Sequence, residues 1–124
     1  MCALAVGCGG AEKGSPKPIS GPPKEVAAVV AQLERATAKR DFNAICDDLL
    51  SSAARQRAGG SDCARLLGER AGTIRRPRIV VQSIEVNGSR AQVRVRTTAG
   101  GQAATTDVLH MVRENGRFRI SSLG

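Results

Sequence analysis

The stretch RIVVQSIEVNGSRAQVRVRTTAGG, residues 78–101, decides the fold because apolar and polar side chains alternate along most of its length. A period of two residues is typical of a β-strand with one face against a core, since successive side chains point to opposite faces. The stretch therefore predicts two consecutive strands. The expected faces are Val80, Ile84 and Val86 alternating with Val81, Ser83 and Glu85, and Ala91, Val93 and Val95 alternating with Gln92, Arg94 and Arg96.

Three dipeptides divide this half of the chain: Asn87-Gly88, Gly100-Gly101 and Asn115-Gly116. Such pairs supply the positive φ angles that tight hairpin turns require. They separate four predicted strands, at about residues 78–86, 91–99, 102–113 and 117–122. Strands that are joined in order by tight turns form an antiparallel meander.

Before residue 78 the apolar residues recur at helical spacing instead. The pattern predicts a helix from about Pro23 to Lys39, and a second from about Phe42 to Leu50 with Asp41 as its N-cap. Two shorter helices are expected next, one capped by Ser52 and ending near Arg57, the other capped by Ser61 or Asp62 and ending near Gly72. Helices followed by an antiparallel sheet predict an α+β fold.

The order of these elements resembles the NTF2-like (SnoaL-like, cystatin-like) superfamily, in particular its small actinobacterial lipoproteins and secreted proteins. The motifs are D-x-x-x-x-C-x-x-L-L-S on the second helix, a further cysteine on a later helix, and G-x-F-x-I-x-S-L at the end of the chain. The resemblance implies N-terminal helices packed on a curved four-stranded meander, forming a cone whose open end is a ligand pocket in some members and is filled in others. The residues that carry it are Asp41, Cys46, Leu49, Leu50, Ser51, Cys63, Asn115, Gly116, Phe118, Ile120, Ser122 and Leu123.

The first ten residues, MCALAVGCGG, are similar to the end of an export signal. Ala5-Val6-Gly7-Cys8 resembles the lipobox of bacterial lipoproteins, whose cysteine takes the lipid and becomes the new N-terminus. We therefore interpret residues 1–8 as the remnant of a lipoprotein signal peptide, with Cys8 as the lipidation site. Residues 9–23 are expected to form a flexible linker and residues 24–124 the domain. The alternative is an apolar N-terminus with a free thiol.

The cysteines suggest one covalent crosslink. If Cys8 takes lipid and Cys2 is removed with the signal, Cys46 and Cys63 remain, 17 positions apart and each on the inward face of its own helix. A bond between them is expected in an exported protein and contributes about 3 kcal/mol in the loop-entropy model. Two buried free thiols in a cytosolic protein are the alternative. Neither cysteine has the neighbouring ligands of a zinc site.

The charge is strongly basic, with 19 Lys and Arg against 11 Asp and Glu and a net charge of +8. Arg94 and Arg96 share one strand face, which makes a basic surface plausible. Nucleic acid is nevertheless disfavoured as a partner, because single-strand binders stack bases on exposed rings and Phe42 and Phe118 are the only aromatic residues. Anionic lipid headgroups or envelope polymers fit the charge better.

Catalytic candidates are few. Asp107 is predicted on the strand face of Leu109 and Met111, where a carboxylate facing a pocket can act as a general base. His110, the single histidine, is expected on the other face beside Val108. Its more frequent role in such a place is as a packed or rim residue. The ketosteroid-isomerase-like relatives stabilise an oxyanion, usually with a tyrosine, and the chain contains none.

The sequence thus predicts a non-enzymatic cell-envelope lipoprotein whose NTF2-like domain binds a small ligand or a partner. The alternative is a small isomerase or hydratase-like enzyme that uses Asp107 in the cone. No cofactor and no metal site are expected. The membrane would be contacted through the lipid anchor, at the extracytoplasmic face, unless the protein is secreted. No stretch reaches the roughly 20 apolar residues that a membrane-spanning helix needs. The oligomeric state and the ligand are not predicted.

Overall fold

The computed structural model describes residues 21–123. The expectations for Cys2 and Cys8, for the signal remnant and for residues 9–20 of the linker lie outside these residues. None of the described helices is both long enough and apolar enough to cross a membrane.

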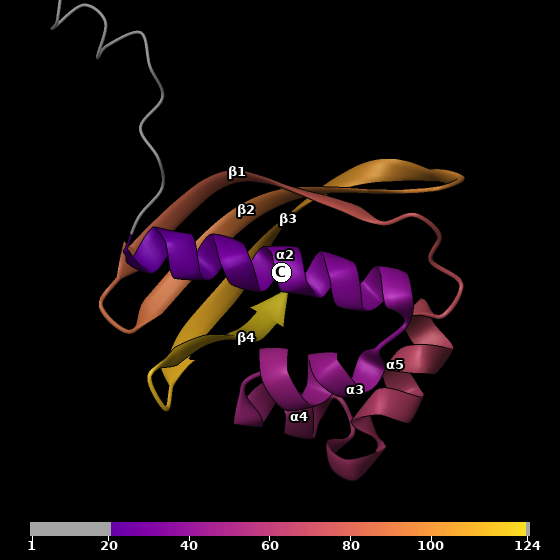
Figure 1. Cartoon of the computed structure of the whole chain (residues 1–124), viewed down its shortest axis with the longest axis horizontal. Helices are drawn as coiled ribbons and strands as arrows, with labels where there is room; N and C mark the ends of the chain where they lie inside the picture. The colour runs from indigo at the N-terminus through magenta and orange to yellow at the C-terminus, as the bar shows by residue number, and fades with distance from the viewer. Residues whose placement is uncertain (1–20, 124) are drawn as a thin grey trace, which may run out of the picture.

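Helices come first and strands second, as the sequence predicted (Figure 1). The helical half consists of α2 (Pro22–Lys39), α3 (Phe42–Ala44), the π-helical turn η1 (Ile45–Leu49), α4 (Ser52–Arg57), the 3-10 turn η2 (Gly60–Asp62) and α5 (Cys63–Ala71). The second half consists of β1 (Arg78–Asn87), β2 (Arg90–Ala99), β3 (Gln102–Glu114) and β4 (Arg117–Leu123).

The strands form one open antiparallel sheet in the order β1-β2-β3-β4. This confirms the predicted meander and the α+β class. Asn115 and Gly116 suit the turn between β3 and β4, because both adopt positive φ angles, 51° and 79°. A two-residue turn with this geometry matches the twist of the strands that it joins.

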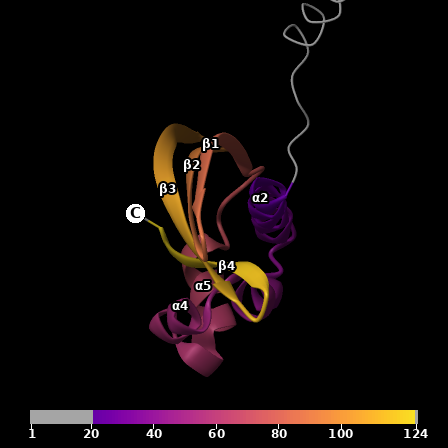
Figure 2. The same ribbon diagram turned by 90° about the vertical axis from the view of Figure 1, so that its left-hand side faces the viewer.

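The long helix α2 lies along one face of the sheet, and α4 and α5 lie together at one end of the molecule (Figures 1 and 2). Val26 and Val30 of α2 are fully or almost fully buried, as are Val93 and Val95 of β2. The core is mainly aliphatic, with Phe42 and Phe118 as its aromatic members. Burial of this apolar surface is the main stabilising contribution to the packing of helices on the sheet.

Two polar contacts also join α2 to the sheet. The carboxylate of Glu34 accepts a hydrogen bond from the backbone N–H of Ile79 at 2.6 Å, where β1 begins. Near the other end of α2, the guanidinium of Arg113 pairs with Glu25 at 3.2 Å and lies 4.2 Å from the centre of the Phe118 ring. The helix is therefore attached to the sheet near both of its ends.

The predicted faces of β1 are wrong in one respect. A β-bulge lies between Val81 and Ser83, so the alternation changes phase within the strand. Val81 faces the core together with Ile84 and Val86, whereas Val80 is 52% exposed. Strict alternation predicts Val80 on the same face as Ile84 and Val86, because it takes no account of an inserted residue.

Two further local predictions need correction. The helix expected from Phe42 to Leu50 is α-helical only in its first turn and continues as η1, in which the N–H of Leu50 bonds to the carbonyl of Ile45 at 2.9 Å. Over nine residues the α and π periods bury nearly the same positions, so the pattern does not distinguish them. The cap of α4 is Ser51, whose Oγ accepts from the N–H of Ala54 at 3.1 Å, and not Ser52.

Candidate ligand pocket

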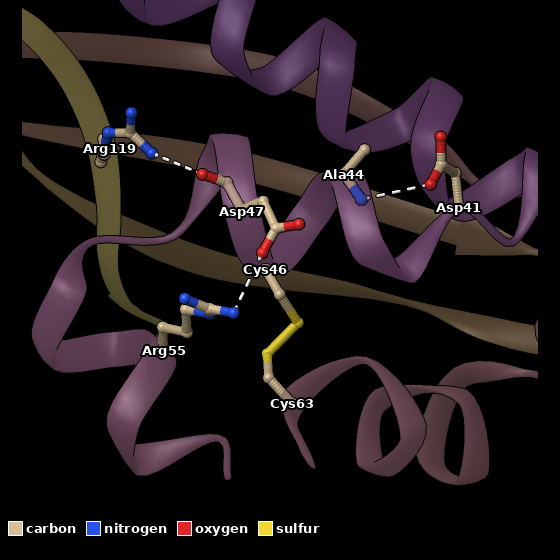
Figure 3. A network of polar contacts seen from close by, with 7 residues as sticks. All are labelled: Asp41, Ala44, Cys46, Asp47, Arg55, Cys63 and Arg119. Carbon is tan, nitrogen blue, oxygen red and sulfur yellow. Dashed lines mark hydrogen bonds and ion pairs between the residues drawn. A yellow bond between two sulfur atoms is a disulfide. The ribbon is translucent and has the colours of Figure 1, made fainter. Parts of the chain in front are cut away.

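Cys46 and Cys63 hold the helical end of the molecule together. They form a disulfide with an S–S distance of 1.98 Å, and both are buried. This is the pair that the sequence leaves for a crosslink. The bond joins η1 to the first residue of α5 (Figure 3). Both segments also contribute side chains to one pocket.

Polar contacts also connect η1, the turn that carries Cys46, to α4 and to β4 (Figure 3). Asp47 of η1 pairs through its carboxylate with Arg55 of α4 at 3.2 Å, and its carbonyl accepts from Arg119 of β4 at 3.0 Å. The backbone N–H of Ser51 bonds to the carbonyl of Ile120 at 2.8 Å. The turn that carries Cys46 is thus connected to a helix on one side and to the last strand on the other.

A pocket of about 620 Å³ lies between this helical end and the sheet. This size is within the range of 300 to 1,000 Å³ that is usual for small-molecule sites. Its wall is mostly apolar. The larger apolar residues that line it are Leu33, Phe42, Ile45, Leu50, Leu67, Ile74, Ile79, Val95, Leu109, Ile120 and Leu123. Leu123 is 64% exposed, so the pocket opens to solvent near the end of β4.

Asp107 lines this pocket, on the strand face that the sequence predicted. It is half-buried, lies opposite Val95 of β2, and accepts a hydrogen bond from the hydroxyl of Thr105 at 3.2 Å. Because β4 pairs with β3 only from Leu109 onward, Asp107 lies on the part of β3 that extends beyond the end of β4. It is the single carboxylate among the described residues that line the pocket.

His110 is separate from the pocket. It alternates with the buried residues Leu109 and Met111 and therefore faces the side of the sheet away from the helices. Its neighbours across the strands are Gln92 and Ser122. The structure does not bring His110 and Asp107 together, so the two candidates do not form an acid–base pair.

Two arginines of the pocket are not among the site residues that the sequence predicts. Arg57, the last residue of α4, donates from its guanidinium to the carbonyl of Ser121 and lines the pocket. Arg70, in the last turn of α5, is exposed and also lines it. The spacing of Arg70 three residues after Leu67 places both on one helix face, a signal that the sequence does contain. Nothing in the pattern around Arg57 indicates its position.

A second, smaller pocket of about 260 Å³ lies between α2, η1 and the hairpin of β3 and β4. Its polar residues include Glu25, which is already paired with Arg113, and Asp48. Its volume is below the usual range for ligand sites. Within residues 21–123, no three side chains of His, Cys, Asp or Glu lie close enough together to hold a metal ion. The larger pocket is therefore the candidate site.

Comparisons with known proteins show that this chain is similar in fold to several solved structures. No family model matches the chain, and no curated protein matches it. Among solved structures it is similar to a SEC-C motif containing protein from Rhodopseudomonas palustris, with a TM-score of 0.59 and 20% identity over 83% of this chain and 77% of that one. A de novo designed NTF2 fold protein gives a TM-score of 0.55 and 20% identity, covering 84% of this chain and 87% of the design.

A multiply substituted designed protein of the NTF2 type is also similar, with a TM-score of 0.59 and 14% identity, covering 79% of this chain and 93% of the design. These similarities confirm the NTF2-like fold that the motifs indicated. At these identities they concern the fold and not the activity.

Proposed function

We propose that this NTF2-like domain is a non-enzymatic binding module that takes a small, largely apolar molecule in the pocket between its helices and its sheet. The observation that carries the proposal is the pocket itself, with its usual ligand-site volume and its apolar wall. The disulfide adds support, because the helical wall is held in place before a ligand arrives, which lowers the ordering cost of binding.

Binding can be tested with N-phenyl-1-naphthylamine, a neutral fluorophore whose emission rises in apolar surroundings. We expect saturable binding to the full oxidised chain. Ile79→Trp should abolish it, because Ile79 lines the pocket and a larger ring would occupy the space. Val80→Trp is the matched control, since Val80 is the next residue of β1 and is 52% exposed. Absence of binding to the wild-type chain, or equal binding to both folded variants, would contradict the proposal.

The cellular part of the proposal is that the domain stands at the extracytoplasmic face of the membrane, held by a lipid on Cys8. The sequence Ala5-Val6-Gly7-Cys8 supports this, and so does the Cys46–Cys63 disulfide, because such bonds persist in oxidising compartments. Mass spectrometry of membrane fractions from the native host, with the gene expressed in its own genomic context, should find a diacylated N-terminal Cys8. Recovery of unmodified Cys8 in a soluble cytosolic product would contradict the anchor.

A small enzyme is the second candidate, favoured by the position of Asp107 in the pocket wall. A carboxylate there could remove a proton next to a carbonyl group. The test is exchange of the α-protons of cyclohexanone in D₂O, followed by NMR, with Asp107→Asn as the comparison. The enzyme candidate requires exchange that the wild type accelerates and the variant does not. Equal rates with and without protein would reject it for this probe and leave the binding proposal standing.

A further inference from the structure

The candidate pocket has an excess of positive charge. Among the described residues that line it, Arg57 and Arg70 are cationic and Asp107 alone is anionic. Asp107 accepts a hydrogen bond from Thr105, and no described arginine lies within ion-pair distance of it. Neither of the two arginines therefore forms an ion pair with the one acid that shares their pocket.

Other arginines of the same helices are paired. Arg55, two residues before Arg57 on α4, pairs with Asp47 at 3.2 Å. Arg65 of α5 pairs with Asp62 and Glu69 at 3.7 Å and 3.1 Å. Within residues 21–123, neither Arg57 nor Arg70 has a carboxylate within 4.0 Å. Asp47, Asp62 and Glu69 are thus paired with arginines outside the pocket. The two arginines that line it form no ion pair with a described carboxylate.

Both arginine side chains line the pocket and can donate hydrogen bonds to the charged end of a ligand. Arg57 is held at the pocket because its guanidinium donates to the carbonyl of Ser121 in β4, and this contact uses only part of its five N–H donors. Arg70 comes from α5, which lies at the same end of the molecule as α4 (Figures 1 and 2). A guanidinium binds carboxylate and phosphate groups through parallel hydrogen bonds, and it is less strongly hydrated than an ammonium.

We propose that the ligand is an anionic amphiphile, with an apolar body against the wall of the pocket and a carboxylate or phosphate monoester held by Arg57 and Arg70. This inference rests on the proposed binding function and specifies the chemical class of its ligand. The shared chemistry is a terminal oxyanion on an apolar chain, which a fatty acid or an alkyl phosphate would supply.

The experiment uses displacement of N-phenyl-1-naphthylamine from the full oxidised chain by four probes with a twelve-carbon chain. Each ionic probe is used below its critical micelle concentration, and the neutral one below its solubility limit. The four probes are dodecanoate, dodecyl phosphate, dodecanol and dodecyltrimethylammonium. We expect the better of the two anions to bind at least about tenfold more tightly than dodecanol, and the cation to bind most weakly. This advantage should fall as salt is raised, because exposed charges are screened. The ranking of dodecanoate and dodecyl phosphate decides between a carboxylate and a phosphate.

Variants test whether Arg57 and Arg70 are the residues that hold the charged group of the ligand. Arg57→Gln and Arg70→Gln should each reduce the advantage of the anion over dodecanol, whereas the affinity for dodecanol should change little. Arg55→Gln is the matched control, because Arg55 lies on the same helix as Arg57 but is paired with Asp47 and does not line the pocket. If Arg57→Gln does not fold, because its contact with Ser121 is lost, Arg70→Gln carries the test alone, since Arg70 is exposed.

Two kinds of failure can be distinguished. If the fluorophore and dodecanol bind but neither anion binds more tightly, or if Arg70→Gln keeps the full advantage of the anion, the inference is overturned and the binding function stands. If the fluorophore does not bind to the wild-type chain, the proposed function fails, and the inference fails with it.

Discussion

The disulfide between Cys46 and Cys63 joins two buried residues that are 17 positions apart, one in η1 and one at the start of α5. Both elements lie beside the candidate pocket and depend on neighbouring segments for their positions. The bond therefore affects both the stability of the domain and the shape of its ligand site, and it is the first feature to test.

Removal of the disulfide should destabilise the domain by about 3 kcal/mol, since a closed loop of this length limits the unfolded chain to that extent. The measurement is urea denaturation of the wild-type chain with and without reductant, together with the double variant Cys46→Ala and Cys63→Ala. Both treatments should lower the midpoint. Equal midpoints, or titration of all four cysteine thiols of the chain in its unfolded oxidised form, would show that the bond is not formed.

The β-bulge in β1 predicts that two adjacent valines differ in how well they tolerate substitution by a polar residue. Val81→Thr should destabilise the domain by about 1 to 3 kcal/mol, because a hydroxyl would enter the core face without a partner. Val80→Thr should stay within about 0.5 kcal/mol, because Val80 is exposed on the opposite face. Chemical denaturation of both variants measures the difference. The reverse order would mean that the strand follows simple alternation without the bulge.

The contact of Glu34 with the N–H of Ile79 predicts a measurable link between α2 and β1. Glu34→Ala should cost about 1 to 3 kcal/mol, because it removes a charged acceptor and leaves a half-buried donor unpaired. Glu34→Gln, which keeps a carbonyl acceptor, should cost less. Glu85→Ala, on the exposed face of the same strand, is the control. Hydrogen exchange of the Ile79 amide should accelerate in Glu34→Ala alone, and an unchanged rate would argue against the contact.

The cap of α4 gives a comparison between two neighbouring serines. Ser51→Ala should destabilise the domain by about 1 kcal/mol, because the buried Ser51 hydroxyl accepts the N–H of Ala54. Ser52→Ala should cost less, since the Ser52 hydroxyl makes an exposed contact with Glu114 and its backbone N–H still reaches that carboxylate. Thermal unfolding of the two variants decides between them, and a larger loss for Ser52→Ala would restore Ser52 as the cap.

The sequence by itself determined the type and order of the main elements. The period-two pattern of residues 78–101, the turn pairs such as Asn115-Gly116 and the helical spacing before them act through neighbours in the chain, so local physics is enough to read them. The face of Asp107 followed from the same patterns. The pairing of Cys46 with Cys63 was predicted instead by assigning Cys2 and Cys8 to an export signal. The positions of Arg57 and Arg70 at the pocket followed from neither, although Arg70 shares a helix face with Leu67.

Only the tertiary structure decided which of two adjacent valines faces the core and which of two adjacent serines caps α4. The bulge that buries Val81 in place of Val80 depends on the pairing with β2. Ser51 caps α4 in a chain segment whose backbone bonds to Ile120, a residue 69 positions later. The pocket is lined by residues of α4, of α5 and of the sheet. Its charge therefore depends on which residues, distant in sequence, are brought together there. Periodicity carries no information about such contacts, because they are formed by packing.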